Sequence, residues 1–407
     1  MNIRSITYFF DPYWPDFKEA FHRAGTFIAA ARPAFEDAGY EVQTVRLATV
    51  PFALLPDANS VQAMVREAKA LEKSAVEQGF DYLSLGPAIP SAPWSYQAIS
   101  EVLASTENVF LSGMMTTKDL GVWLEAVRYC AGAIHQIAPI SPDGFANLRF
   151  AALANVAPHS PFFPAAYSEG EGPSFALATE AADLAVQAFN GAENLSDARE
   201  RLVLAIEMHA RNLMETGEGL ARRFNLPFNG IDFSLAPFPE EARSLGAALE
   251  RLGVPAVGAP GSLAAAAILA EAVDRARFKR TGFSGLMLPV HEDATLAARA
   301  AEGRLTITDL LLYSAVCGTG LDTLSLPGDV SVEQLQAILL DLAALSTRLK
   351  KPLTARLMPV PGMKAGDETH FDFAYFANSR VMEVKGSGLG GFFLGEGTFD
   401  LQARSER

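Results

Sequence analysis

Cysteine is scarce in this sequence, and Cys130 and Cys317 are the two among 407 residues. Two cysteines cannot supply the disulfide framework that holds small secreted domains together, and no cysteine or histidine pair has the spacing of a zinc site. We therefore expect the chain to work in a reducing compartment, the cytoplasm, without structural disulfides.

Positive charge and long apolar runs are also in short supply. Lys and Arg number 33 against 47 Asp and Glu, which gives a net charge of −14, and basic residues concentrate only at 275–280. We expect no nucleic-acid partner, because binding phosphates needs concentrated Lys and Arg. No stretch approaches the ~18 uninterrupted apolar residues of a membrane span, and Met1 is not followed by an apolar signal core. A membrane partner is therefore not expected either.

The sequence does contain a regular alternation of short apolar runs with amphipathic helical patterns. About ten of the apolar runs have the length and the flanking turn residues of strands. The eleven candidate runs lie at residues 3–10, 40–48, 80–85, 109–111, 150–156, 174–177, 230–236, 254–257, 283–290, 321–326 and 353–358. Most are followed by a helical pattern, and this order predicts an α/β protein with a largely parallel sheet. The clearest helix follows Ser331, which forms a capping-box pattern with Gln334.

No segment is long or polar enough to divide the chain, so we expect a single domain over residues 1–407. The glycine-rich segment 385–407 lacks the Lys-Ser/Thr ending of a phosphate-binding loop. We interpret it as a C-terminal tail or flap over the site.

Polar residues follow many of the expected strands. Because the carboxyl ends of parallel strands lie together, we expect these residues to share one rim or the interior of one barrel. Ser112, His159 and Glu169 are candidates for ligand binding on such loops. His159 and His291 are the two histidines on them, and for each we favour a surface position over a catalytic role.

Asp232 and Ser234 alternate with Ile231 and Phe233, so strand geometry places both polar side chains on the inner face. A buried carboxylate needs a partner. The partner of Asp232 can be a structural arginine or a backbone turn. Alternatively, Asp232 is catalytic and Ser234 contacts a ligand.

Four further residues complete the candidate site. Glu292 and Asp293 open an expected helix, so they either complement its dipole or serve as a general base. Together with Asp232 they can also hold a hard cation through oxygen ligands. Cys317 and Asp322 flank a glycine turn, where Cys317 is a nucleophile only if its thiolate is stabilised, and otherwise a small buried residue.

Three stretches of the sequence resemble a known family. They are residues 232–239 (DFSLAPFP), 282–293 (GFSGLMLPVHED) and 317–322 (CGTGLD), with weaker similarity at 153–156 and 167–170. In these stretches the chain resembles the uncharacterised domain-of-unknown-function 711 family, from about Val109 to Val384. The resemblance implies a fold similar to the pyruvate formate-lyase barrel, in which two parallel five-stranded halves are set antiparallel and loops enter the interior. We therefore expect a ten-stranded α/β barrel, although strand count alone equally allows eight strands.

The resemblance brings no established reaction, and the sequence identifies no cofactor. Glycyl-radical enzymes carry a glycine in a C-terminal segment that is similar to 380–384 here, but Glu383 stands in its place. Radical chemistry of that kind is therefore not expected. We expect an enzyme that acts on a small polar metabolite by acid–base or metal-assisted chemistry. The alternative is a non-catalytic small-molecule-binding or regulatory protein, and the sequence leaves open a homo-oligomer.

Overall fold

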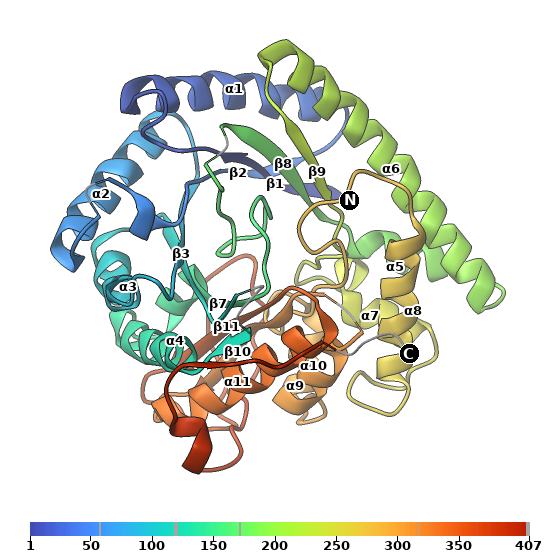
Figure 1. Ribbon diagram of the computed structural model, residues 1–407. Coiled ribbons are helices and arrows are strands. Elements are labelled where there is room, and N and C mark those ends of the chain that lie inside the picture. The colour runs from blue at the N-terminus through green and yellow to red at the C-terminus, as the bar shows by residue number, and fades with distance from the viewer. Residues whose placement is uncertain (57, 118–120, 171, 317, 404–407) are drawn as a thin grey trace.

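The computed structural model describes residues 1–56, 58–117, 121–170, 172–316 and 318–403. Helices form an outer layer, and a large sheet lies inside them (Figure 1). Because the apolar runs alternate with amphipathic helices, each helix can cover the outer face of the strands that flank it. The α/β class expected from the sequence is confirmed.

The large sheet has nine strands among the described residues, in the order β10-β11-β7-β4-β3-β2-β1-β8-β9. Its strands are β1 (Asn2–Phe9), β2 (Val42–Ala48), β3 (Tyr82–Ala88), β4 (Val109–Met114), β7 (Phe150–Ala154), β8 (Ser174–Glu180), β9 (Phe228–Asp232), β10 (Gly320–Pro327) and β11 (Leu353–Val360). A second, small sheet contains β5 (Thr116–Thr117), β6 (Gly121–Trp123) and β12 (Thr398–Phe399).

Strand direction divides the large sheet into a central run and two flanking pairs. The run β7-β4-β3-β2-β1 is parallel throughout. The pairs β8-β9 and β10-β11 are each internally parallel, but β8 is antiparallel to β1 and β11 is antiparallel to β7. The carboxyl ends of the strands therefore lie at both ends of the molecule. Of the two expected alternatives, one shared rim is therefore wrong, because strands of opposite direction cannot end at the same rim, and only the interior remains.

The helices of the outer layer differ widely in length. They are α1 (Phe17–Asp37), α2 (Val61–Glu77), α3 (Trp94–Ser105), α4 (Leu124–Ile137), α5 (Ala182–Phe189), α6 (Leu195–Phe224), α7 (Leu245–Arg251), α8 (Ser262–Arg275), α9 (Ala294–Ala301), α10 (Ile307–Ser314) and α11 (Val332–Leu349). The capping box of Ser331 and Gln334 is present at the start of α11. Side-chain caps also start α1 at Asp16 and α6 at Asn194, which satisfies backbone N–H groups of the first turn.

A closed ten-stranded barrel is not confirmed. Residues 283–290, expected to be a strand, form only isolated bridges, from Leu286 to Leu235 near β9 and from Pro289 to Asp322 in β10. Gly282, Ser284 and Pro289 interrupt any regular ladder, because two of them have positive φ and proline has no N–H group. Residues 254–257 form a turn instead of the expected strand.

The core lies mainly between the sheet and the helix layer. Phe27 of α1 packs on Phe175 of β8, with ring centroids 4.7 Å apart, and Phe175 stacks on Phe228 of β9 at 4.9 Å. All three rings are buried. These contacts hold the helices on the outer face and leave the inner face of the sheet for other groups.

A loop occupies the inside of the sheet. The residues described between β7 and β8, 155–170 and 172–173, run through the centre of the molecule (Figure 1). Ser84 of β3 donates to the Ala166 carbonyl at 2.7 Å, and Ser168 N–H donates to the Thr49 carbonyl at 2.8 Å. These hydrogen bonds hold the loop against the central strands, on the inner face of the sheet.

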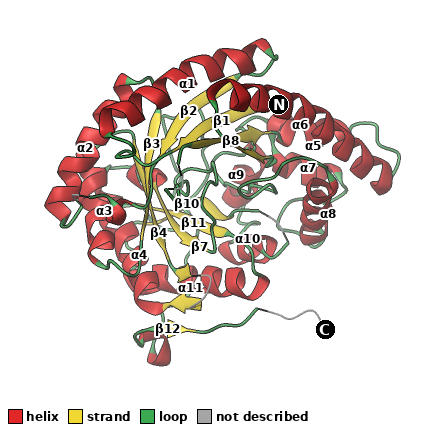
Figure 2. Ribbon diagram, turned by 45° about the horizontal axis from the view of Figure 1, so that its top comes forward, coloured by secondary structure: helices red, strands yellow, loops and turns green. Residues whose placement is uncertain are grey.

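The C-terminal tail lies along the outside of α4 and α11, with β12 beside them (Figure 2). Arg128 of α4 donates to the carbonyls of Leu394 and Gly395, and Arg348 of α11 donates to the Gln402 carbonyl. None of the described residues from 385 onward is buried. Within the described ranges, the helices are all too short or too polar to cross a membrane.

Candidate functional site

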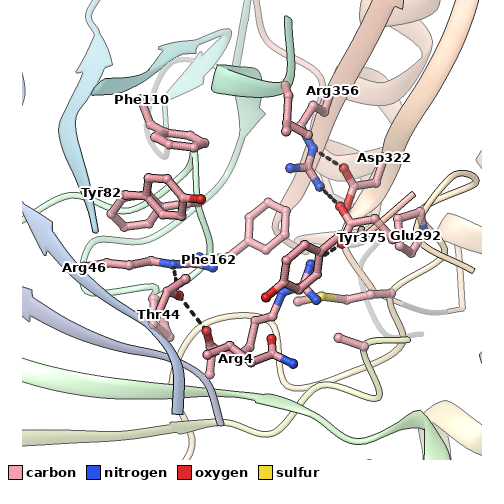
Figure 3. A pocket seen from close by; sticks show the side chains of 18 of the residues that line it. Arg4, Thr44, Arg46, Tyr82, Phe110, Phe162, Glu292, Asp322, Arg356 and Tyr375 are labelled. Carbon is pink, nitrogen blue, oxygen red and sulfur yellow. Dashed lines mark hydrogen bonds and ion pairs between the residues drawn. The ribbon is translucent and has the colours of Figure 1, made fainter. Parts of the chain in front are cut away.

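A cavity of about 100 Å³ opens on the inner side of the sheet (Figure 3). Its lining comprises Arg4, Gln43, Thr44, Arg46, Tyr82, Phe110, Leu148, Pro161, Phe162, Phe163, Ala178, Thr179, Ala236, Met287, Pro289, Glu292, Asp322, Arg356, Phe373 and Tyr375. These residues come from strands as far apart in the sheet as β10 and β8, so the sheet curls around the cavity. Strand alternation explains the polar side chains: Thr44 and Arg46 face inward while Val45 and Leu47 enter the core.

A chain of ion pairs forms one side of the cavity. Arg356 donates to Asp322 at 2.5 Å and to Glu292 at 2.8 Å. Glu292 also pairs with Arg4, and Arg4 continues the chain to Glu180 at 3.1 Å. Glu180 pairs in turn with Arg243. Each of these three carboxylates is almost wholly buried and each is balanced by an arginine, as buried charge requires.

Arg46 differs from the other arginines of the cavity. Its Nε donates to Thr44 Oγ1 at 2.9 Å, and its guanidinium lies over the rings of Tyr82 and Phe163 at 5.9 and 5.1 Å. In the part of the chain that the structure describes, no carboxylate forms an ion pair with it. Burial lowers the pKa of Arg46 to about 10, and the nearby charge of Arg4 adds to this. The side chain is still a cation at neutral pH, and it extends into the cavity (Figure 3).

Asp322 has one engaged and one unengaged oxygen. Oδ1 accepts from Arg356, while Oδ2 is buried and has no hydrogen-bond partner among the described residues. Burial raises the pKa of Asp322, and although Arg356 opposes this, the charge of Glu292 adds to the increase. A buried carboxyl oxygen of this kind needs a ligand, a water or a proton.

The backbone beside Asp322 is strained. Thr323 has φ +48°, which is rare for a β-branched residue, and the pairing of β10 with β11 shifts register between Leu321 and Leu324. Such bulges redirect a side chain, and strain of this type concentrates at functional sites. The Thr323 hydroxyl accepts from the His291 N–H at 3.3 Å, which helps to hold the bulge.

Glu292 and Asp322 have pKa values pushed in opposite directions. Burial acts to raise the pKa of Glu292, but the Arg4 and Arg356 guanidiniums outweigh it and lower that pKa below its usual range. The pKa of Asp322 is raised. Two carboxyl groups that share one arginine and titrate apart are suited to different roles, one as a fixed charge and one as a proton donor or acceptor.

Aromatic side chains form the opposite wall and the mouth. Tyr82 and Phe110 meet edge to face at 5.0 Å, and Phe110 meets Phe163 at 5.5 Å. At the mouth, the Tyr375 ring lies 5.1 Å from the Arg4 guanidinium. The cavity therefore has a charged side and an apolar side (Figure 3).

Of the residues proposed from the sequence, the structure brings Glu292 and Asp322 together through Arg356. Asp232 and Ser234 lie elsewhere. Asp232 accepts from Ser234 Oγ at 2.5 Å, from Phe283 N–H at 3.0 Å and from Ser284 N–H at 2.8 Å. This is the backbone-turn alternative, and both residues are buried outside the cavity lining. Burial raises the pKa of Asp232, although these hydrogen bonds oppose it.

Asp293 is the N-cap of α9, where it accepts from Thr295 and Leu296 N–H groups. It also accepts from Ser244 Oγ at 2.6 Å and Gly246 N–H at 3.0 Å, so its oxygens are fully used. Among the described residues, no group of three or more His, Cys, Asp or Glu can hold a metal ion, and this includes Asp232, Glu292 and Asp293.

The remaining candidates are spread over other places. Ser112 is buried in β4, and its hydroxyl has no partner among the described residues. His159 lies in the interior loop at φ +61°, against the ring of Phe9. Glu169 is exposed and lines a second cavity of about 800 Å³, beyond the interior loop, whose wall includes the tail residues Asp400 to Ala403. Cys317 lies outside the described residues.

His291 is not a surface residue. Its ring is fully buried, with Nε2 2.7 Å from Ser325 Oγ and Nδ1 3.0 Å from the Ala377 carbonyl. Burial lowers the pKa of His291 to about 4, so the ring is neutral at physiological pH. We assign it a structural role, in joining β10 to the segment that carries Tyr375.

Sequence reasoning missed the arginines. Arg4, Arg46 and Arg356 each lie inside a largely buried strand, and the clearest case is LTARLMPV of β11, where the other residues are apolar except Thr354. A permanently charged residue in a buried strand is costly unless it is paired, and this was the signal that could have found them.

Comparison with known proteins agrees with the resemblance seen in the motifs. The family model described as "Uncharacterised ACR (DUF711)" matches residues 1–378, further toward the N-terminus than the motifs indicated. A UPF0210 protein of Pyrobaculum arsenaticum is 35% identical over 368 residues, covering 85% of this chain and 80% of the relative. A UPF0210 protein of Oleidesulfovibrio alaskensis is 31% identical over 384 residues, covering 89% and 83%. The chain therefore belongs to the uncharacterised DUF711 family, whose members include the UPF0210 proteins.

Proposed function

We propose that the protein is an enzyme that binds the anionic group of a small metabolite at Arg46 and transfers a proton through Asp322. Glu292, held ionised between Arg4 and Arg356, fixes the charge of the site. The reaction takes place in the cavity on the inner side of the sheet.

The observation that carries this proposal is that Arg46 has no carboxylate partner among the described residues. The other cavity arginines meet carboxylates, whereas Arg46 meets Thr44 and two aromatic rings. A buried guanidinium is stabilised most by an anion that accepts from its N–H groups, and a carboxylate or phosphate fits its planar fork.

Asp322 supports catalysis rather than binding alone. Its Oδ2 faces no donor among the described residues, and its pKa is raised by burial. A carboxyl group in this state can give a proton to a bound ligand or take one from it, provided that the ligand lies within hydrogen-bond distance. No step is assigned to a metal or cofactor.

The proposal also covers the strands around the cavity, the domain organisation and the location of the protein. Residues 278–290 lie between β9 and β10 and bridge to both, which supports a ring of ten strands around the cavity. We propose a single domain over residues 1–407 and a cytoplasmic location, as the composition suggests.

Binding at Arg46 is tested by calorimetry. Isothermal titration with acetate and inorganic phosphate compares the wild type with Arg46→Gln, and Arg23→Gln on the surface of α1 serves as the control. Loss of one charge-assisted contact should weaken binding roughly 10- to 100-fold in Arg46→Gln and leave the control unchanged. Equal affinity in all three proteins would refute the proposed site.

Catalysis is tested with the metabolite that co-purifies with the protein, identified by mass spectrometry. Asp322→Asn should bind it and fail to convert it, because the amide cannot exchange a proton at neutral pH. If the wild type also returns the metabolite unchanged, the protein is the non-catalytic binder that the sequence left open.

A further inference from the structure

We propose that the anion held at Arg46 is the one carboxylate of a monocarboxylate whose remaining part is compact and apolar, either a branched chain or a single ring. This inference rests on the proposed function and names its substrate class.

The charges of the site favour a monoanion. Four arginines, Arg4, Arg46, Arg243 and Arg356, share the region with three carboxylates, and every arginine except Arg46 meets one of them. While Asp322 is ionised against Arg356, one ligand carboxylate balances Arg46. A phosphate monoester carries close to two negative charges at neutral pH and would leave one of them unbalanced in a buried site.

The geometry at Arg46 favours a carboxylate as well. The rings of Tyr82 and Phe163 contact the guanidinium, whose N–H groups lie in its plane. Its Nε is used by Thr44 Oγ1. The terminal N–H groups at the edge of the guanidinium are therefore left for the ligand, and a planar carboxylate matches that edge.

The apolar part of the lining, which we call the apolar wall, determines the rest of the ligand. The apolar residues of the lining include Phe110, Leu148, Phe162 and Met287. Each of these side chains is almost wholly buried from solvent. Their side chains offer no strong hydrogen-bond donor or acceptor. A polyol or a second carboxylate placed against this wall would lose its water without gaining partners, whereas an apolar group gains from leaving water. The cavity of about 100 Å³ limits that group to a small one.

The test is a calorimetric comparison of six compounds on the full chain. Acetate supplies the anionic head alone, isovalerate and benzoate add an apolar part, gluconate adds hydroxyls, succinate adds a second carboxylate, and phenyl phosphate changes the anion. Isovalerate or benzoate should bind at least ~30-fold more tightly than acetate, as burial of the additional carbons implies. Gluconate, succinate and phenyl phosphate should each bind more weakly than the better of these two.

A substitution in the apolar wall tests whether the gain in affinity comes from contact with that wall. Met287→Gln is close to isosteric and should weaken isovalerate and benzoate about tenfold, with acetate unchanged. Leu148→Asn is the second variant if Met287→Gln does not fold.

The outcomes separate this inference from the proposed function. If gluconate, succinate or phenyl phosphate binds most tightly, the substrate class is wrong, and the proposed function stands provided that Arg46→Gln abolishes that binding. Unchanged binding of isovalerate and benzoate in the wall variants also refutes the class. If no compound of the six binds to the wild type, both the class and the proposed function are refuted.

Discussion

Glu292 accepts hydrogen bonds from two arginines, whereas the neighbouring Asp293 accepts only from hydroxyl and backbone groups. Both are buried, and their positions in the sequence differ by one residue. Neutralising Glu292 and neutralising Asp293 should therefore affect stability differently, because only Glu292 is paired with arginines that would lose an anion. Asp322 is intermediate, because it pairs with one arginine whereas Glu292 pairs with two.

We predict that Glu292→Gln costs about 3 kcal/mol of unfolding free energy at pH 7, because Arg4 and Arg356 lose their shared anion and each keeps a single carboxylate. Asp322→Asn should change it by less than ~1 kcal/mol, because the fold already disfavours the ionised form and the amide oxygen still accepts from Arg356. Urea unfolding of both variants measures the difference. Equal losses would contradict the assignment of fixed charge to Glu292 alone.

The pH dependence follows from the directions of the two shifts. The pKa of Glu292 is lowered, so its contribution to stability is present above its ordinary value of 4.5 and is lost as pH falls through the folded value. The pKa of Asp322 is raised, so its contribution is present below 3.8 and is lost as pH rises through the folded value.

His291 should produce a measurable loss of stability in mild acid. Its pKa is about 4 in the folded protein against an ordinary 6.5, so the unfolded chain binds the proton first. Stability is therefore retained above pH 6.5 and falls as pH drops toward 4, by roughly 3 kcal/mol in total. We expect His291→Gln to remove this slope between pH 6.5 and 4 in thermal unfolding, and His22→Gln at the surface of α1 to keep it. A wild-type slope in His291→Gln would show that the ring is not buried as a neutral group.

At the scale of elements, the turn after α8 is built around Asp232. Gly282 lies there at φ +59°, and a Cβ atom on it would come within 2.2 Å of Asp232 Oδ2. The N–H groups of the next two residues bind the same carboxylate. This turn therefore depends on Asp232 for its shape, which is the structural alternative for that residue.

Gly282→Ala tests this contact against a matched glycine. Gly303 has φ +71°, and a Cβ atom on it would have no neighbour within 4 Å, so Gly303→Ala should cost only the backbone strain, about 1–2 kcal/mol. Gly282→Ala should cost a further ~1–3 kcal/mol from the clash with Asp232. Chemical denaturation compares the two. If anion binding at Arg46 also disappears in a folded Gly282→Ala, Asp232 serves the site after all.

Local patterns predicted most of the elements but not the direction of the strands, for which the family resemblance alone implied antiparallel halves. The helix after Ser331 could be placed to the residue, because its cap and apolar spacing are local. Helix α3 was missed, since Pro93 at its start makes no side-chain cap. The reversal of β8 and β11 relative to the central run depends on which strands pair, and no local pattern contains that information.

The same reason explains why only half of the site could be predicted. Glu292 and Asp322 follow turn patterns and were named as candidates. Arg4 and Arg356 lie at opposite ends of the chain. Their ion pairs with Glu292 form only after folding.

On the scale of the whole molecule, the site and the tail are separate. Residues 385–403 lie on the outside of α4 and α11 and contact the second cavity, whereas the Arg46 cavity is lined by other residues. The tail also exposes Phe392, Phe393 and Phe399. We therefore propose that segment 385–407 acts as a flap over the second cavity and not over the Arg46 cavity.

Deletion of residues 385–407 should leave anion affinity at Arg46 unchanged and shift the melting temperature by less than ~3 °C, because no described residue of the tail is buried. Calorimetry and thermal unfolding of the truncated chain measure both. Loss of anion binding on deletion would place the flap over the Arg46 cavity instead.

The distance along the chain between Arg4 and Arg356 has a consequence for synthesis. A ribosome adding roughly 5–20 residues per second needs on the order of 20–70 s to pass from one to the other. For most of that interval the nascent chain has β1 with its arginine but not Glu292, and Arg356 is added only at its end. The first strands can pair early, yet the cavity forms only when β10 and β11 have emerged. A chain released before then has no site at all, so translation that stops early leaves no partly active protein.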